Sequence, residues 1–178
     1  MKVYEGKNLR NVAVVGHGSD GKTTLVEAFL ANAKATDRRG RVEDGNTTTD
    51  YDPEEIKRGI SITTALAPIE WDGCKINLID APGFFDFEGE ITQAYYLADE
   101  ALILVNAFSG VGVGADKAYK YCKKAGKPMA FAVNQIDKEH ASFDKVLEEL
   151  RSSYGQAVAP LQYPIMEGNA FKGFVDVV

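Results

Sequence analysis

Hydrophobic residues in this chain gather in short runs that alternate with amphipathic stretches. The runs at 12–15, 101–105 and 128–133 are almost continuously apolar, which is typical of strands covered on both faces. Apolar residues recur at helical spacing over 24–33 and 142–154, which predicts amphipathic helices. This alternation predicts an α/β fold, in which a mostly parallel sheet carries helices on both faces.

One antiparallel hairpin strand is expected to extend this sheet. The run 60–71 predicts a strand, Asp72-Gly73 is a two-residue turn signal, and 74–79 predicts the return strand. Near the end of the chain, residues 161–165 and 173–178 predict another strand, a turn and the start of a further strand.

The strand at 12–15 and the helix at 24–33 flank a glycine-rich motif. Residues 16–23 read G-H-G-S-D-G-K-T, which matches the phosphate-binding P-loop, G-x-x-x-x-G-K-[S/T]. In this context the backbone N–H groups of the loop and the helix N-terminus point at one anion. Lys22 is predicted to reach the outer phosphates, and the Thr23 hydroxyl to bind Mg²⁺. The alternative is a glycine-rich turn that merely ends in Lys-Thr, and the flanking elements argue against it.

A long segment after the P-loop helix lacks a clear period. Residues 36–59 are rich in charge, and a loop this long in a compact domain is usually functional or mobile. Its position favours a switch loop that becomes ordered when nucleotide binds. Two helices follow later in the chain, at 88–99 and at 114–125, and Gly126 is the expected C-terminal cap of the second.

Asp80-Ala81-Pro82-Gly83 follows directly on the predicted strand at 74–79. A carboxylate at the C-terminal end of a strand beside a P-loop suits Mg²⁺ coordination through a water. Gly83 could donate its backbone N–H to a γ-phosphate. The pattern D-x-P-G alone is commonly a turn, and its place after a P-loop and a switch-like loop gives it meaning.

Asn134-Gln135-Ile136-Asp137 follows the strand at 128–133 and predicts guanine recognition. The Asp137 carboxylate can accept both the ring N1–H and the exocyclic N2–H of guanine. Adenine presents no such pair of donors, so the preference for guanine is geometric. An ATP-using P-loop enzyme is therefore disfavoured.

Composition bounds the remaining function classes. The chain has 178 residues and a formal net charge of -6. One domain is expected. The negative charge argues against direct binding to nucleic acid, and no sequence-specific contact between this domain and nucleic acid is expected. Cys74 and Cys122 form no disulfide framework and are expected to be inert packing thiols. No signal peptide or membrane-spanning run is visible, so a cytoplasmic domain without membrane contact is expected.

Together and in this order, the motifs resemble the GTPase domain of translational GTPases, and within them elongation factor G. Residues 40–45 and 57–63 resemble the beginning and end of that family's switch I, and 80–87 resemble the start of its switch II. Residues 160–165 and 171–176 favour elongation factor G over elongation factor Tu. They resemble the start of the subdomain that elongation factor G inserts into its GTPase fold.

The resemblance implies one GTPase domain over 1–178, with switch I at about 36–62 and the start of the inserted subdomain at about 160–178. The family's last guanine motif and final strand and helix are absent, so we expect an N-terminal fragment of a longer factor. Its expected ligands are GTP or GDP and Mg²⁺. Its expected partner is the ribosome, reached through the intact protein, and a monomer is expected.

Four positions depart from the family pattern. Ser61 replaces the threonine that closes on Mg²⁺ and the γ-phosphate, and it keeps the hydroxyl. Phe84 replaces the histidine that positions the attacking water, which predicts a low intrinsic rate, because such a group contributes about 10²–10⁴ in rate. Ser19 stands where the family has an aspartate, although Asp20 is adjacent. Gln135 replaces the lysine that lies along the purine.

Three functions remain open. The first is GTP hydrolysis with Mg²⁺ on the ribosome by an elongation factor G-like translation factor. The second is a GTP/GDP-binding regulatory switch with negligible hydrolysis, and the third is a ribosome-protection or release-factor-type GTPase. The expected nucleotide contacts are Gly16, His17, Gly18, Ser19, Asp20, Gly21, Lys22, Thr23, Thr24, Asp80, Ala81, Pro82, Gly83, Phe84, Asn134, Gln135 and Asp137. The expected Mg²⁺ ligands are Thr23, Ser61 and Asp80, and the expected catalytic positions are Lys22, Ser61, Gly83 and, with the histidine role vacant, Phe84.

Overall fold

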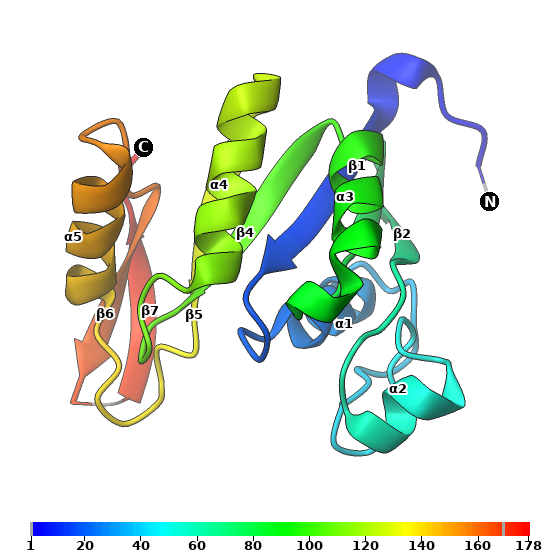
Figure 1. Ribbon diagram of the computed structural model, residues 1–178, viewed down its shortest axis with the longest axis horizontal. Helices are drawn as coiled ribbons and strands as arrows, with labels where there is room; N and C mark the ends of the chain where they lie inside the picture. Colours follow the sequence, from blue (N-terminus) through cyan, green and yellow to red (C-terminus); the bar gives the residue numbers. More distant parts are fainter. Residues whose placement is uncertain (1, 169) are drawn as a thin grey trace.

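The computed structural model describes residues 2–168 and 170–178, and within them a central sheet of five strands lies in the order β2-β3-β1-β4-β5 (Figure 1). Strands β1, β3, β4 and β5 are parallel, and β2 pairs antiparallel with β3. The predicted α/β fold with a mostly parallel sheet and one antiparallel strand is therefore confirmed. The strands are β1 (Leu9–Gly16), β2 (Ala65–Trp71), β3 (Cys74–Asp80), β4 (Glu100–Asn106) and β5 (Met129–Asn134).

Helices cover both faces of this sheet. Val14 and Val15 are adjacent in β1 but belong to opposite hydrophobic clusters, because side chains alternate across a strand. The cluster around Val14 includes Leu30 of α1, whereas the cluster around Val15 includes Cys122 of α4 and Val146 of α5. Burial raises the pKa of Cys122, which suits a packing thiol. The helices are α1 (Lys22–Asn32), α2 (Pro53–Arg58), α3 (Glu88–Leu97), α4 (Val113–Ala125) and α5 (Phe143–Tyr154), with short 3-10 turns η1 (Gly6–Asn8) and η2 (Phe85–Phe87).

The strand predicted from Ile60 begins only at Ala65, so its first five residues were predicted wrongly. The backbone N–H groups of Ile62 and Thr63 donate to Oε1 of Glu55, at 2.9 Å each. The N–H of Thr64 donates to a carboxylate oxygen of Glu90 at 2.8 Å. These N–H groups are therefore not available for pairing between β2 and β3, which starts with the pair Ala65 and Asp80.

The lack of periodicity in 36–59 had suggested a segment without secondary structure, but α2 lies within it. Asp52 is the N-cap of α2 and forms a capping box with Glu55, while Pro53 occupies the first turn. Gly59 ends the helix in the left-handed conformation, with φ of 63°. Each of these is a known helix boundary signal, so the helix is specified by its ends rather than by an apolar stripe.

The tail forms a separate antiparallel hairpin of β6 (Gln162–Glu167) and β7 (Ala170–Asp176). Figure 1 shows it beside α5. The Tyr163 ring meets the Phe143 ring edge-on at 5.1 Å between centroids, and its hydroxyl donates to Asp144. The predicted strand, turn and strand are confirmed here. None of the described helices is long and apolar enough to cross a membrane.

Candidate nucleotide-binding site

The P-loop joins the end of β1 to the start of α1 through a tight, internally bonded turn. The backbone N–H of His17 donates to Oδ2 of Asp20 at 2.9 Å, and Nζ of Lys22 donates to the carbonyl oxygen of His17 at 2.8 Å. Gly21 precedes the helix with φ of 88°, a conformation that favours glycine. The side chains of Asp20 and Lys22 therefore hold the loop in the conformation from which α1 begins.

Lys22 is a buried cation at this site. Its exposed fraction is 7%, and burial lowers its pKa, while Asp80, Asp20 and Asp50 oppose that effect. Burial likewise raises the pKa of Asp20. A buried ammonium among carboxylates fits the binding of an anion whose charge it neutralises.

Side-chain oxygens from three parts of the chain meet beside Lys22. Oγ1 of Thr23 lies 3.1 Å from Oγ of Ser61, and Oγ1 of Thr49 donates to Oδ2 of Asp80 at 2.8 Å. Asp80 is 1% exposed, and its other oxygen, Oδ1, has no hydrogen-bond partner among the described residues. Burial raises the pKa of Asp80 to about 6, against the opposing effect of the Thr49 hydrogen bond.

These oxygens fit a Mg²⁺ ion that binds together with a phosphate. In the described part of the chain, no group of three or more His, Cys, Asp or Glu side chains is placed to hold a metal. Mg²⁺ does not need one, because it commonly uses one or two carboxylates together with substrate phosphates and water. The unpaired buried oxygen of Asp80 is an acceptor of the kind that an ion or its water would satisfy.

The D-x-P-G segment lies directly on the P-loop. A Cβ atom added at Gly83 would lie 2.3 Å from Nζ of Lys22 and 2.8 Å from Cα of Gly18. Phe84, the next residue, places its ring against Gly18 and is 37% exposed. Lys22 and Gly83 thus lie next to each other. At the position of the family's histidine, the aromatic ring of Phe84 packs on the P-loop.

The N-x-x-D segment also contacts the P-loop. Nδ2 of Asn134 donates to the carbonyl oxygen of Asp20 at 2.8 Å, and Nε2 of Gln135 donates to that of Ser19 at 2.9 Å. Oε1 of Gln135 accepts from Nδ2 of Asn106 at 3.0 Å. The carboxylate of Asp137 is on an exposed residue, where a base could approach it.

Several buried polar residues of this region were not predicted. Glu27 is 1% exposed, and its carboxylate accepts the backbone N–H groups of Gly40, at 2.8 Å, and Thr48. Asp50 is buried too, and burial raises its pKa while the Ser61 hydroxyl opposes this. A signal existed for Glu27, since it follows Thr23 by four residues and so shares its helix face.

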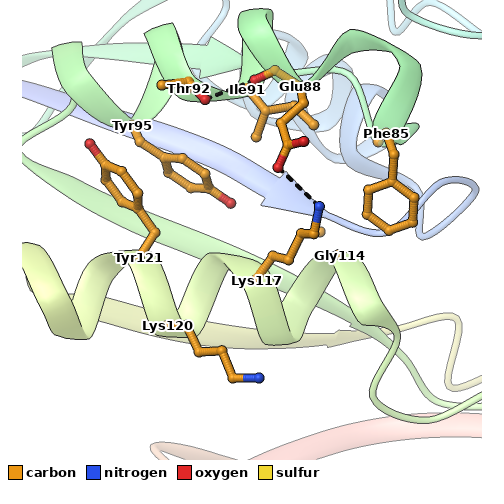
Figure 2. Close-up of a pocket in the computed structure, with 11 residues that line it drawn as sticks. Phe85, Glu88, Ile91, Thr92, Tyr95, Gly114, Lys117, Lys120 and Tyr121 are labelled. Carbon is orange, nitrogen blue, oxygen red and sulfur yellow. Dashed lines mark hydrogen bonds and ion pairs between the residues drawn. The ribbon is translucent and has the colours of Figure 1, made fainter.

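A cavity of about 230 Å³ lies between α3 and α4, beside the P-loop (Figure 2). Gly16 and Gly83 reach its wall. Nζ of Lys117 pairs with Glu88 at 2.9 Å and lies 4.5 Å from the centre of the Phe85 ring. This ion pair therefore connects the start of α3 to α4. The stacked rings of Tyr95 and Tyr121, with centroids 4.4 Å apart, form another part of the wall.

The sheet, the P-loop and the two segments placed on it define a P-loop nucleotide-binding protein. Residues 7–176 match the family described as the elongation factor Tu GTP binding domain. The chain belongs to this family of translational GTPases. The predicted resemblance to the GTPase domain of translational GTPases is thereby confirmed, and the relatives that follow confirm the resemblance to elongation factor G.

Relatives of three kinds are similar to this chain. An elongation factor G-like protein of Mycobacterium tuberculosis (strain CDC 1551 / Oshkosh) is 37% identical over 160 residues, which cover 90% of this chain and 22% of the relative. Mitochondrial ribosome-releasing factor 2 of Bos taurus is 38% identical over 170 residues, which cover 96% and 22%. Elongation factor G of Granulibacter bethesdensis is 33% identical over 172 residues, which cover 97% and 25%.

A crystal structure of a protein from Thermus thermophilus matches with a TM-score of 0.91 and 43% identity, over 97% of this chain and 26% of that one. The chain thus spans about a quarter of the length of these relatives. The comparisons identify the chain as an elongation factor GTP-binding domain of the group that contains elongation factor G-like proteins and ribosome-releasing factors.

Proposed function

We propose that this chain binds GTP and GDP with Mg²⁺ and hydrolyses GTP slowly, as the GTPase domain of an elongation factor G-like factor that acts on the ribosome. The observation that carries the proposal is the meeting of three motifs on one loop. Asn134 bonds the backbone of the P-loop at 2.8 Å, Ser61 lies 3.1 Å from Thr23, and Gly83 packs on Lys22.

In this proposal the phosphates lie along the P-loop. Lys22 and the loop's N–H groups neutralise phosphate charge, and the N–H of Gly83 donates to the γ-phosphate. Phosphoryl transfer is mostly a matter of such positioning and electrostatics. Thr23 and Ser61 would hold Mg²⁺, with Asp80 behind a water. Bound Mg²⁺ would neutralise phosphate charge and polarise the transferred group.

The attacking water lacks its usual side-chain partner. A phenyl ring neither accepts nor donates a proton, so Phe84 cannot orient the water as a histidine would. Backbone groups of this chain or a group of the ribosome must then do so, and the intrinsic rate is expected to be low. The second candidate, a GTP/GDP-binding switch with negligible hydrolysis, is favoured by the same residue.

Guanine selection rests on Asp137 in this proposal. Its carboxylate would accept the N1–H and N2–H groups of guanine, while Asn134 and Gln135 support the loop. Inosine lacks the N2 amino group, so ITP would lose one charge-assisted hydrogen bond, which is worth about 1.5–3 kcal/mol. GTP should therefore bind about 10–100 times more tightly than ITP.

The test is displacement of a fluorescent GDP in the presence of Mg²⁺. Displacement by GTP and GDP but not by ATP supports the proposal, and Asp137→Ala should abolish the preference for GTP over ITP. Displacement by ATP at similar concentration would overturn the assignment of guanine. Turnover measured with and without ribosomes in the intact factor then separates a slow GTPase from a switch without hydrolysis.

The similarity to ribosome-releasing factor 2 supports a further alternative, in which the intact factor acts in ribosome release rather than elongation. The proposed domain limits follow the family: one GTPase domain over 1–178, with switch I at about 36–62 and an inserted subdomain starting at about 160. A monomeric cytoplasmic domain that makes no direct sequence-specific contact with nucleic acid is also part of the proposal.

A further inference from the structure

A buried carboxylate, Glu55, connects α2 to the residues that follow Ser61. Glu55 has an exposed fraction of 0%. Its Oε1 accepts the N–H groups of Ile62 and Thr63 at 2.9 Å each and the hydroxyl of Thr63 at 3.1 Å. Its Oε2 accepts the N–H of Asp52 at 3.2 Å. The Glu55 side chain thus joins the N-terminus of α2 to the segment at Ile62, which lies seven residues after Glu55 in the sequence.

This carboxylate remains charged although it is buried. Burial by itself raises its pKa, but hydrogen bonds from the N–H groups of Thr63, Ile62 and Asp52 outweigh burial, and the pKa of Glu55 is lowered overall. Charge-assisted hydrogen bonds are about twice as strong as neutral ones. The hydrogen bonds to the Glu55 carboxylate are therefore strong, and they do not depend on pH near neutrality.

The hydrogen bonds of Glu55 restrict the residue that lies between them. The backbone N–H of Gly59 donates to the carbonyl oxygen of Glu55 at 2.8 Å, and that of Ile60 to the same oxygen at 3.3 Å. Ser61 therefore lies between Ile60 and Ile62, and the N–H groups of both these neighbours donate to Glu55. Because the peptide unit between Ser61 and Ile62 is planar, fixing the Ile62 N–H also fixes the Ser61 carbonyl group. The Ser61 hydroxyl then lies 3.1 Å from that of Thr23.

A second buried carboxylate supports the other end of the same segment. Glu27 of α1 accepts the N–H groups of Gly40 and Thr48, just before Thr49, which bonds Asp80. Glu27 therefore acts on Thr49, whereas Glu55 acts on Ser61. The two contributions are separable by mutation, because they rest on different backbone donors.

We propose that Glu55 is a positioning residue for Mg²⁺ and nucleotide, which acts by holding Ser61 against Thr23. The proposal rests on the proposed function, since Ser61 matters in this way only if it binds Mg²⁺ at the P-loop. Glu55 itself contacts neither metal nor nucleotide. Its removal should weaken the use of Mg²⁺ without changing the choice of base.

The test is the Mg²⁺ dependence of binding of a fluorescent, slowly hydrolysed GTP analogue. Outer groups that orient metal ligands are worth about 10–100-fold in metal affinity, so Glu55→Ala should raise the Mg²⁺ concentration for half-maximal binding by at least about tenfold. Glu55→Gln keeps one acceptor oxygen and should give a smaller shift. The matched control is Glu54→Ala, because Glu54 is adjacent and pairs with Arg58 at the surface.

Two further readouts separate positioning from general support of the fold. Affinity without Mg²⁺ and the preference for guanine over adenine should stay unchanged in Glu55→Ala. Ser61→Ala should produce a shift of its own, and the double variant should shift no further than the larger single one, because coupled residues are not additive. Additive shifts would overturn the proposal.

The remaining outcomes are equally decisive. An unchanged Mg²⁺ requirement in both Glu55 variants overturns the positioning role while leaving the proposed function intact. An equal loss of affinity at every Mg²⁺ concentration means that Glu55 supports only the fold. If Glu55→Ala does not fold, the comparison of Glu55→Gln with Glu54→Ala decides. Failure of the unmodified chain to bind any guanine nucleotide would instead overturn the proposed function.

Discussion

The ring of Phe84 packs directly on Gly18 of the P-loop, so that a Cβ atom added at Gly18 would lie 2.9 Å from Cζ of Phe84. The two positions are complementary, because the space that the ring occupies is the space that a side chain at Gly18 would need. The departure from the family's histidine is therefore accommodated by the residue beneath it.

We expect Gly18→Ala to destabilise the chain by about 1 kcal/mol, at the low end of overpacking costs. The cost should be modest because the Phe84 ring is partly exposed and can move aside. Urea unfolding of Gly18→Ala, Phe84→Ala and the double variant measures it. In the Phe84→Ala background the Gly18→Ala substitution should cost almost nothing, and an unchanged cost there would contradict the packing relationship.

Phe84→His should raise GTP turnover on the ribosome in the intact factor. An imidazole can orient the attacking water and accept a proton, and such groups contribute about 10²–10⁴ in rate. Phe85→His is the matched control, since Phe85 lies next to it but faces Lys117. Equal turnover in Phe84→His and the parent protein would mean that another feature limits the rate.

Glu27→Ala should loosen the segment between α1 and α2. The buried N–H of Gly40 would lose its acceptor, at a cost of about 1–3 kcal/mol. Limited trypsin digestion reports this directly, because Arg38, Arg39 and Arg41 lie at that point of the chain. We expect faster cleavage there in Glu27→Ala and an unchanged rate in Glu43→Ala, whose side chain is exposed.

The stability of the metal-free chain should fall as pH rises from about 4 to about 6. Burial raises the pKa of Asp80 from 3.8 to about 6, so the folded state binds more protons than the unfolded state in this window. Stability then decreases with pH, by about 3 kcal/mol for a shift of this size. Denaturant unfolding in EDTA measures it.

Asp80→Asn is the variant that isolates this contribution, since the amide keeps an acceptor for Thr49. Its stability should exceed that of the unmodified chain at pH 7, and the difference should vanish near pH 4. A constant difference across this range would mean that Asp80 does not titrate there. With Mg²⁺ and nucleotide present, the order at pH 7 should reverse.

The elements that the sequence predicted correctly are those that local physics specifies. The continuous apolar runs became β1, β4 and β5, because such runs can be buried only inside a covered sheet. Asp72 and Gly73 both have positive φ, at 45° and 75°, as a type I′ hairpin turn requires. Gly126 likewise ends α4 in the left-handed conformation.

The errors arose where a distant carboxylate competes for the backbone. Nothing within 60–64 indicates that Glu55 and Glu90 take the N–H groups that a strand would use. The short helix α2 lacks an apolar stripe, so periodicity missed it although its cap residues were visible. Local pattern predicts what the chain could form, and tertiary partners decide which option it takes.

The candidate site shows the same division. The motifs around Lys22, Asp80 and Asn134 were predicted to converge, because parallel strands deliver their C-terminal ends to one edge of the sheet. The roles of Thr49 and Glu27 were not predicted. Thr49 meets Asp80 across 31 residues, and Glu27 meets Thr48 across 21, separations that no local motif specifies.

The amide groups of Asn134 and Gln135 both donate to the backbone of the P-loop. They hold the carbonyl oxygens of Asp20 and Ser19 towards β5. In a trans peptide the N–H points away from its carbonyl oxygen, so the N–H groups of Gly21 and Asp20 are turned the opposite way. The segment that we propose to read the base therefore also orients two peptide dipoles of the P-loop.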